Sequence, residues 1–134
     1  MAELLEKVAA TTVTNVTVTT TTEAVAISSG PVKVPYATCR VAIKGWCQLT
    51  TGTATTTVAA AIRRGTAITG ALVGEANATE VKAAAGSTEE FIIMVSEDRA
   101  TVDTVEYSLT VLQASATGNG TVLQASIEVE ILNG

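Results

Sequence analysis

Residues 123–131 read Leu-Gln-Ala-Ser-Ile-Glu-Val-Glu-Ile, so that apolar and polar side chains alternate along the whole stretch. Successive side chains of a β-strand point to opposite faces, and this period of two predicts a strand with one dry and one solvated face. The same alternation runs through residues 39–49, where the apolar positions of one parity are Cys39, Val41, Ile43, Cys47 and Leu49. Two such stretches indicate a β-protein.

The composition fits one domain with a core of small aliphatic side chains. The chain has 134 residues, a length at which folding hides roughly two-thirds of the surface of the unfolded chain. Hydrophobic residues make up 47% of the sequence but aromatic residues only 3%, and threonine is abundant. Threonine and valine favour extended backbone because branching at Cβ restricts χ1 and packs well on a pleated surface.

Turns that contain glycine or proline divide the chain into about seven or eight short strands, without the pattern of a core helix. This organisation predicts an all-β fold, namely a single-domain antiparallel β-sandwich of jelly-roll type over residues 15–134. A barrel of the same strand count is the alternative. Residues 1–14 are predicted to form an extended N-terminal arm or a short helix. Residues 11–22, almost all Thr and Val, are expected to run along a sheet edge.

The last two predicted strands, residues 105–114 and 121–132, flank a Gly-Asn-Gly turn at residues 118–120. If both apolar stripes face the same core, residues paired across the two strands must have equal parity. A three-residue loop satisfies this condition and places Val111 opposite Ile127. We therefore predict that these strands form a hairpin.

Cys39 and Cys47 share one parity of a predicted strand. On an uninterrupted strand the two residues would lie about 26 Å apart, beyond the reach of a disulfide. A tight turn at residues 44–45 would bring them together, but the alternation passes through Gly45 without a break. We expect two small buried thiols.

The sequence lacks the residues that most enzymes and metal sites need. It has no histidine, which excludes a histidine-based triad and leaves a cysteine nucleophile without its usual base. A cupin-type enzyme shares the expected architecture, but it normally holds its metal with histidines. Glu128 and Glu130 fall on the solvated side of their strand and are interpreted as surface charge. We therefore predict no enzyme activity, no catalytic or metal-ligating residues and no cofactor.

Charge and hydropathy argue against two classes of partner. The net charge is −5 and the basic residues are scattered, whereas nucleic-acid binding needs clustered Lys and Arg. The sequence has no run of about 18 apolar residues, so we predict no membrane span. Residues 1–10 contain Glu3 and Glu6 where a signal peptide has a basic start and an apolar middle, so synthesis in the cytoplasm without export is expected.

Several apolar side chains are expected on the surface. Trp46 has the polar parity of its strand, between Lys44 and Gln48. Residues 91–95 read Phe-Ile-Ile-Met-Val and are apolar on both parities, which requires cover on both faces. Either local loops cover these groups, or they bind other subunits, since aromatic side chains are enriched at interface centres. The candidate interface residues are Leu4, Leu5, Val8, Trp46, Phe91, Ile92 and Met94.

Four segments carry a resemblance to a known class of proteins: Val-Ala-Ile-Lys-Gly-Trp at 41–46, Ala-Ile-Arg-Arg-Gly-Thr at 61–66, Tyr-Ser-Leu-Thr-Val at 107–111 and Thr-Val-Leu-Gln-Ala-Ser at 121–126. This pattern of strands and turns resembles the small jelly-roll structural proteins of tailed-phage virions, most of all those that decorate capsids or head fibres as trimers. The resemblance implies a homotrimer in the virion, bound to the major capsid protein or another shell subunit. It also implies an N-terminal arm that reaches the shell or a neighbouring trimer.

The sequence therefore favours a non-enzymatic structural protein of a virion, an oligomeric subunit that decorates and stabilises the capsid. One alternative is a fibre-head module that binds a glycan or receptor, for which Tyr36 and Trp46 are the available aromatic platforms. Another is a subunit of an extracellular filament joined by strand donation from residues 11–22.

Overall fold

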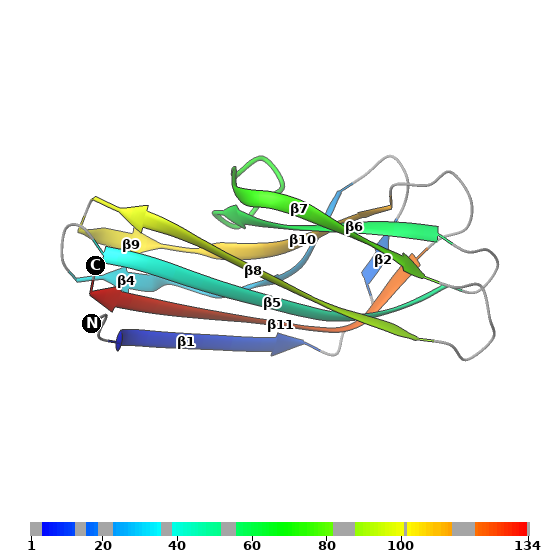
Figure 1. The fold of residues 1–134 in the computed structure, drawn as a ribbon, viewed down its shortest axis with the longest axis horizontal. Coiled ribbons are helices and arrows are strands. Elements are labelled where there is room, and N and C mark those ends of the chain that lie inside the picture. Colours follow the sequence, from blue (N-terminus) through cyan, green and yellow to red (C-terminus); the bar gives the residue numbers. More distant parts are fainter. Residues whose placement is uncertain are drawn as a thin grey trace.

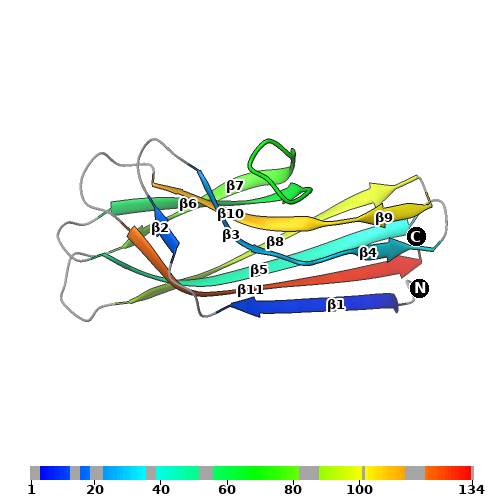
Figure 2. The ribbon, with the colours of Figure 1, turned by 180° about the vertical axis from the view of Figure 1, so that it is seen from behind.

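The computed structural model describes residues 4–12, 16–18, 23–35, 39–51, 56–81, 88–100, 102–113 and 120–133. These residues form an elongated body of strands with no helix among them (Figure 1, Figure 2). One sheet contains β1 (Leu4–Thr12), β2 (Val16–Val18), β5 (Cys39–Thr51), β8 (Glu89–Arg99) and β11 (Gly120–Asn133). The other contains β3 (Ala24–Ser28), β6 (Thr56–Arg64), β7 (Ala71–Val81) and β10 (Tyr107–Gln113). A short ribbon is formed by β4 (Val32–Val34) and β9 (Asp103–Val105).

The two main sheets are antiparallel and enclose one core. The first sheet has the order β1-β11-β5-β8, with β2 also paired to β11, and the second has the order β3-β10-β6-β7. The chain passes repeatedly from one sheet to the other, as in a jelly roll. The predicted all-β sandwich of jelly-roll type is confirmed.

Alternation along β11 decides which side chains enter the core. Ala125, Ile127 and Val129 are buried, while Ser126 and Glu128 between them are only partly covered. A bulge between Val122 and Gln124 shifts the pattern at the start of the strand, so that Val122 is buried there. The largest fully buried side chains of the core are Tyr107, Ile43, Leu49, Ile62, Ile93, Leu109, Ile127, Ile131, Val32 and Val34.

Gly45 makes room for side chains of the opposite sheet. A Cβ at this position would lie 3.0 Å from Leu109 Cδ1 and 3.3 Å from Ile62 Cδ1, both in the second sheet. It would also lie 3.1 Å from Cγ2 of Ile93, its partner on β8. The absence of a side chain therefore allows the two sheets to pack closely at the middle of β5.

The two cysteines lie as predicted. β5 runs without interruption from Cys39 to Thr51, so the alternative turn at residues 44–45 does not occur. Neither cysteine is in a disulfide, and both are buried.

Of the two alternatives expected over residues 1–14, an extended arm or a short helix, the described part is extended, and it pairs within its own sheet. Leu4–Thr12 forms β1, which runs antiparallel to β11 with Val8 in register with Val129. A helix of about ten residues is marginal in water by itself, whereas the edge of β11 offers a row of backbone donors and acceptors. Within the extended segment expected over residues 11–22, Val16–Val18 is β2, also paired to β11.

The predicted hairpin between the last two strands is wrong. β10 pairs with β3 and β6 in the second sheet, whereas β11 pairs with β1 and β5 in the first. The parity argument did identify the buried faces, since Val111 and Ile127 are both in the core. Two inward stripes share a core equally well when their strands lie in opposite sheets, so parity alone does not select the pairing. Residues 118–119 of the expected loop lie outside the described residues.

We expect Gly45→Val to destabilise the fold by about 1–3 kcal/mol, because the added methyl groups overfill the space that Leu109 and Ile62 occupy. Urea unfolding measures the change. The matched control is Ala42→Val, on the outward parity of the same strand, with an expected effect within about 0.5 kcal/mol. Equal effects of the two substitutions would contradict close packing at Gly45.

Candidate interaction surface

The side of the first sheet that points away from the core is the candidate functional surface. The register of β11, β5 and β8 sets Glu128 beside Lys44, and Lys44 beside Met94. The next row across the same strands consists of Ser126, Trp46 and Ile92. Side chains of such rows point to one side of a sheet. We call this surface the outer face, defined by Arg40, Ala42, Lys44, Trp46, Ile92, Met94, Ser96, Ser126, Glu128, Glu130 and Leu132.

Strand β8 carries apolar side chains on both of its sides. Ile93 points inward and is fully buried, whereas Ile92 and Met94 are 52% and 73% exposed. The opposite sheet covers the inward side of β8, as the sequence led us to expect. No part of the described chain covers its outward side. Neighbouring exposed apolar side chains of this size are typical of a binding surface.

A hollow of about 560 Å³ lies on the outer face. Ala42 and Ser96 are paired neighbours with short side chains, and the longer side chains around them leave the sheet surface recessed. The hollow is lined by Arg40, Ala42, Ile43, Lys44, Met94, Val95, Ser96, Glu128, Glu130 and Leu132. The hollow thus combines apolar walls with charged side chains of both signs.

Only part of the predicted interface set comes together. Trp46, Ile92 and Met94 lie on the adjacent strands β5 and β8. The other candidates are Leu4, Leu5 and Val8 in β1, at the opposite edge of the sheet, and Phe91 in β8; the side chains of these four lie outside the described part of the structure. Sequence reasoning missed the charged members of the face, because Lys44 and Glu128 become neighbours only through the pairing of β5 with β11.

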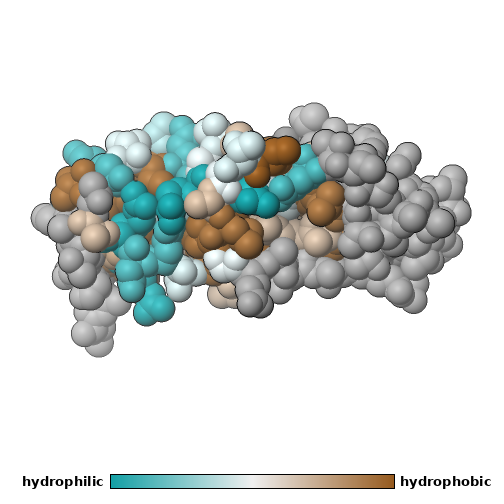
Figure 3. All heavy atoms as spheres, turned by 90° about the horizontal axis from the view of Figure 1, so that it is seen from above, coloured by the Kyte–Doolittle hydropathy of each residue, from teal (hydrophilic) through white to brown (hydrophobic). Residues whose placement is uncertain are grey.

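Elsewhere the exposed apolar side chains of the described residues are dispersed. Seen from above, the molecule shows brown apolar groups separated by teal hydrophilic ones rather than one continuous patch (Figure 3). Ile68 and Leu72 flank the end of the β6–β7 connection, and Val102 lies between β8 and β9. The outer face differs in that two exposed apolar residues of one strand lie beside a tryptophan.

Arg64, Glu97, Arg99 and Asp103 form two partly buried ion pairs. Arg64 Nε donates a hydrogen bond to Glu97 Oε2 at 3.2 Å, and Arg99 Nη2 donates to Asp103 Oδ2 at 2.7 Å. The fully buried Tyr107 hydroxyl has no hydrogen-bond partner among the described residues, and burial together with the nearby Glu97 carboxylate raises the pKa of Tyr107 well above its usual range. Each carboxylate here is held by an arginine, so the cluster is a structural element and offers no free general base.

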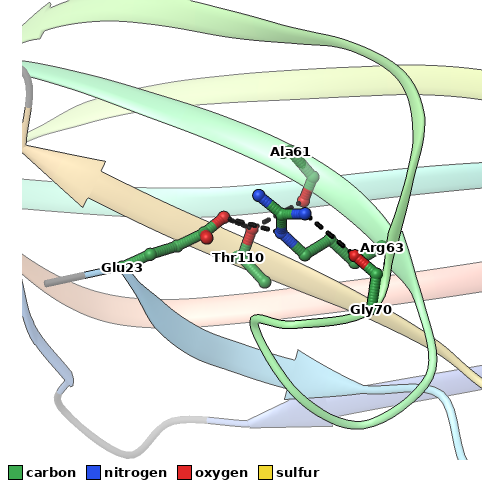
Figure 4. Close-up of polar contacts among 5 residues, drawn as sticks. All are labelled: Glu23, Ala61, Arg63, Gly70 and Thr110. Atoms are coloured by element: carbon green, nitrogen blue, oxygen red, sulfur yellow. Dashed lines mark hydrogen bonds and ion pairs between the residues drawn. The ribbon is translucent and has the colours of Figure 1, made fainter.

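A second polar cluster lies in the second sheet, around Arg63 of β6 and Thr110 of β10 (Figure 4). Arg63 Nε donates to Glu23 Oε1 at 3.0 Å, and Arg63 Nη1 donates to the Gly70 carbonyl oxygen at 2.9 Å. The buried Thr110 hydroxyl donates to the same Glu23 oxygen at 2.7 Å. One carboxylate thereby connects the segment before β3 to β6 and β10, again in a structural role.

The two cysteines of the described chain are buried in the core. Burial raises the pKa of the Cys47 thiol to about 12, so the thiol is neutral and a poor nucleophile at neutral pH. Within the described ranges, no three or more His, Cys, Asp or Glu side chains are grouped to hold a metal ion. None of the described segments is a helix of the length and apolarity needed to cross a bilayer.

No protein-family pattern and no curated protein matches this chain. Among solved structures, the chain is similar to a protein of Bacillus endospore appendages, described as a family of disulfide-linked pili, with 18% identity and a TM-score of 0.41 over 91% of this chain and 86% of that one. A protein of infectious bursal disease virus, Gx strain, gives 9% identity and a TM-score of 0.41 over 95% and 40% of the two chains. The C-terminal CBM6 of the laminarinase LamC from Zobellia galactanivorans gives 8% and 0.33 over 85% and 98%.

We expect the free energy of unfolding to fall as pH rises from about 9 to about 12. In the unfolded chain the Cys47 thiol ionises near its ordinary pKa of 9.0, whereas in the native chain it stays neutral until about 12. The unfolded state therefore releases the thiol proton at lower pH than the native state. Over this window the free energy of unfolding falls by up to about 1.4 kcal/mol per pH unit. Urea unfolding of Cys47→Ala should show a shallower pH dependence, with the remainder from Tyr107. An unchanged slope would contradict the burial effect at Cys47.

We expect Glu23→Ala to destabilise the protein by about 1–3 kcal/mol, because it removes the acceptor of the buried Thr110 hydroxyl and of Arg63. Thermal or urea unfolding measures the loss. Adding Thr110→Val should recover part of it, since the orphaned hydroxyl is then absent. Glu106→Ala, at a half-exposed position between β9 and β10, is the control. Strict additivity of the two changes would contradict the shared hydrogen bond.

Proposed function

We propose that this chain is a non-enzymatic structural subunit that binds copies of itself and a larger protein shell, as an oligomeric capsid decoration protein does. The observation that carries the proposal is the exposed pair Ile92 and Met94 beside Trp46 on the outer face. Exposure of neighbouring large apolar side chains is unfavourable in water, and a subunit contact that buries them is stabilising. The absence of histidine from the sequence supports a role without catalysis.

The finer parts of the proposal follow from the resemblance to tailed-phage virion proteins. They are a homotrimer, a shell of major capsid protein as the partner, and a location in the virion. A subunit that binds only the assembled shell stabilises it by mass action, without chemistry. Because Leu4–Thr12 is a strand of the subunit's own sheet, we assign docking to the outer face rather than to a free arm.

A second candidate is a subunit of an extracellular filament. β1 ends the order of the first sheet among the described residues, and an edge strand of this kind can pair with another chain. The described residues of the expected donor segment, Thr11, Thr12 and Val16–Val18, pair with β11 of their own chain. A filament would therefore grow by pairing of sheet edges rather than by donation of residues 11–22.

A glycan-binding fibre head has less support. Sugar sites need exposed aromatic platforms, whereas Tyr107 is fully buried and Trp46 is half-buried. We therefore rank this function below the two structural ones.

We expect the wild-type protein to associate reversibly and the double variant Ile92→Ser, Met94→Ser to associate at least about tenfold more weakly, because the variant removes the apolar contact. Sedimentation velocity over a concentration series measures the association, and its limiting mass tests the trimer. Val102→Ser, at a residue that is 58% exposed between β8 and β9, is the matched control. Electron micrographs of the wild type separate discrete particles from filaments.

A wild-type protein that remains monomeric up to about millimolar concentration would overturn the proposal of self-association. Equal weakening by Val102→Ser would remove the assignment to the outer face.

A further inference from the structure

The charges on the two middle strands of the outer face lie in two stripes of opposite sign, while the exposed Glu90 and Asp98 on β8 add negative charge at the two ends of that strand. β5 carries Arg40 and Lys44, and the neighbouring β11 carries Glu128 and Glu130. The stripes balance each other, although the whole chain has a net charge of −5. Two copies of the chain therefore repel each other on average, but their β5 and β11 strands can meet without an excess of like charge.

The register of β5 and β11 makes the face complementary to itself. Consider a two-fold axis parallel to the strands and midway between β5 and β11 of both copies. Rotation about this axis places β11 of the second copy over β5 of the first and leaves positions along the strands unchanged. Each residue of one copy therefore faces, in the other copy, the residue type that is its register partner within a single chain. Glu128 of one copy then faces Lys44 of the other, because the two are register partners within one chain. An axis across the strands would instead set β11 against β11 and bring like charges together, which is unfavourable.

The hollow receives a side chain in the same arrangement. Glu130 is the register partner of Ala42, so the rotation sets Glu130 of one copy above Ala42 of the other. Ala42 lines the hollow between Arg40 and Lys44. A carboxylate would thus enter a recess flanked by two cations, an arrangement that strengthens charge-assisted hydrogen bonds as water is excluded.

The same rotation covers the exposed apolar residues. β8 lies on one side of the β5–β11 pair and β1 on the other, so β8 of one copy comes to lie over β1 of the second. Ile92 and Met94 then leave solvent at both ends of the contact. Sheets packed face to face with aligned strands lie about 10 Å apart, a spacing that such side chains fill.

From these features we propose that the occupant of the outer face is a second copy of this chain, related by a two-fold axis parallel to the strands between β5 and β11. This inference rests on the proposed self-association and names the partner of that surface. This two-fold contact through the outer face is compatible with further contacts of the subunit through other surfaces.

The test uses two charge reversals on full-length protein, Lys44→Glu and Glu128→Lys. Each variant alone places like charges across the contact in both positions, so each should associate at least about tenfold more weakly than the wild type. An equimolar mixture should form a one-to-one complex of the two variants, because both contacts then join opposite charges. Native mass spectrometry distinguishes the mixed pair from pairs of identical chains.

The mixture separates a contact between copies from the contact within one copy. Lys44 and Glu128 are also neighbours in a single chain, and mixing leaves that intramolecular repulsion unchanged. Recovery on mixing therefore reports on the intermolecular contact alone. The control mixture is Lys33→Glu with Glu106→Lys, which carries the same charge changes on β4 and before β10, outside this face; it should show no preference for the mixed pair.

Wild-type association that neither reversal weakens, or reversals that mixing fails to rescue, would overturn this two-fold contact while leaving self-association in place. A monomeric wild type would overturn both proposals. Circular dichroism checks the fold of each variant. If a reversal does not fold, Lys44→Gln and Glu128→Gln replace the reversals. Each should weaken association and reduce its dependence on salt, and unchanged association would again overturn the contact.

Discussion

The burial of one side of every long strand between two sheets is the constraint on which this structure depends. β5 and β11 send every second side chain into the core, which is built mainly from Val, Ile, Leu and Ala, with Tyr107 as an aromatic member. Small side chains fill the space only when the sheets lie close together, and Gly45 permits this where Leu109 and Ile62 cross the middle of β5. The outward side chains of the same strands are thereby held in fixed rows.

The sequence predicted the faces of the strands better than their neighbours. Alternation identified the buried side of β5, including both thiols, because parity is a local property of an extended chain. Alternation did not identify the strands that pair with β11. Val111 and Ile127 can both face one core whether their strands lie in the same sheet or in opposite sheets. For the N-terminal segment the sequence left an extended arm and a short helix open for a related reason: the extended form of Leu4–Thr12 pairs with β11, which is distant in the sequence.

The candidate surface shows the same division between local and distant information. The outward position of Trp46 and the two-sided apolar character of β8 follow from parity alone. The hollow does not, because it arises where the short Ala42 and Ser96 become neighbours through the pairing of β5 with β8. The charge stripes likewise require the register that joins Lys44 to Glu128.

The outer face offers a more specific contact than the edge of β8. A long apolar edge strand invites uncontrolled pairing, yet β7 passes close to this edge, where a Cβ at Gly74 would lie only 2.8 Å from Val95 Cγ1. Carboxylates at both ends of β8, including Glu90 and Asp98 on its exposed side, oppose sheet extension by like-charge repulsion. In the proposed contact, association is directed to the outer face, where apolar side chains would supply affinity and the two charge stripes would restrict the orientation. Under this proposal, the charged ends of β8 disfavour pairing at the strand edge, and the charge stripes of the face favour one orientation of the two copies.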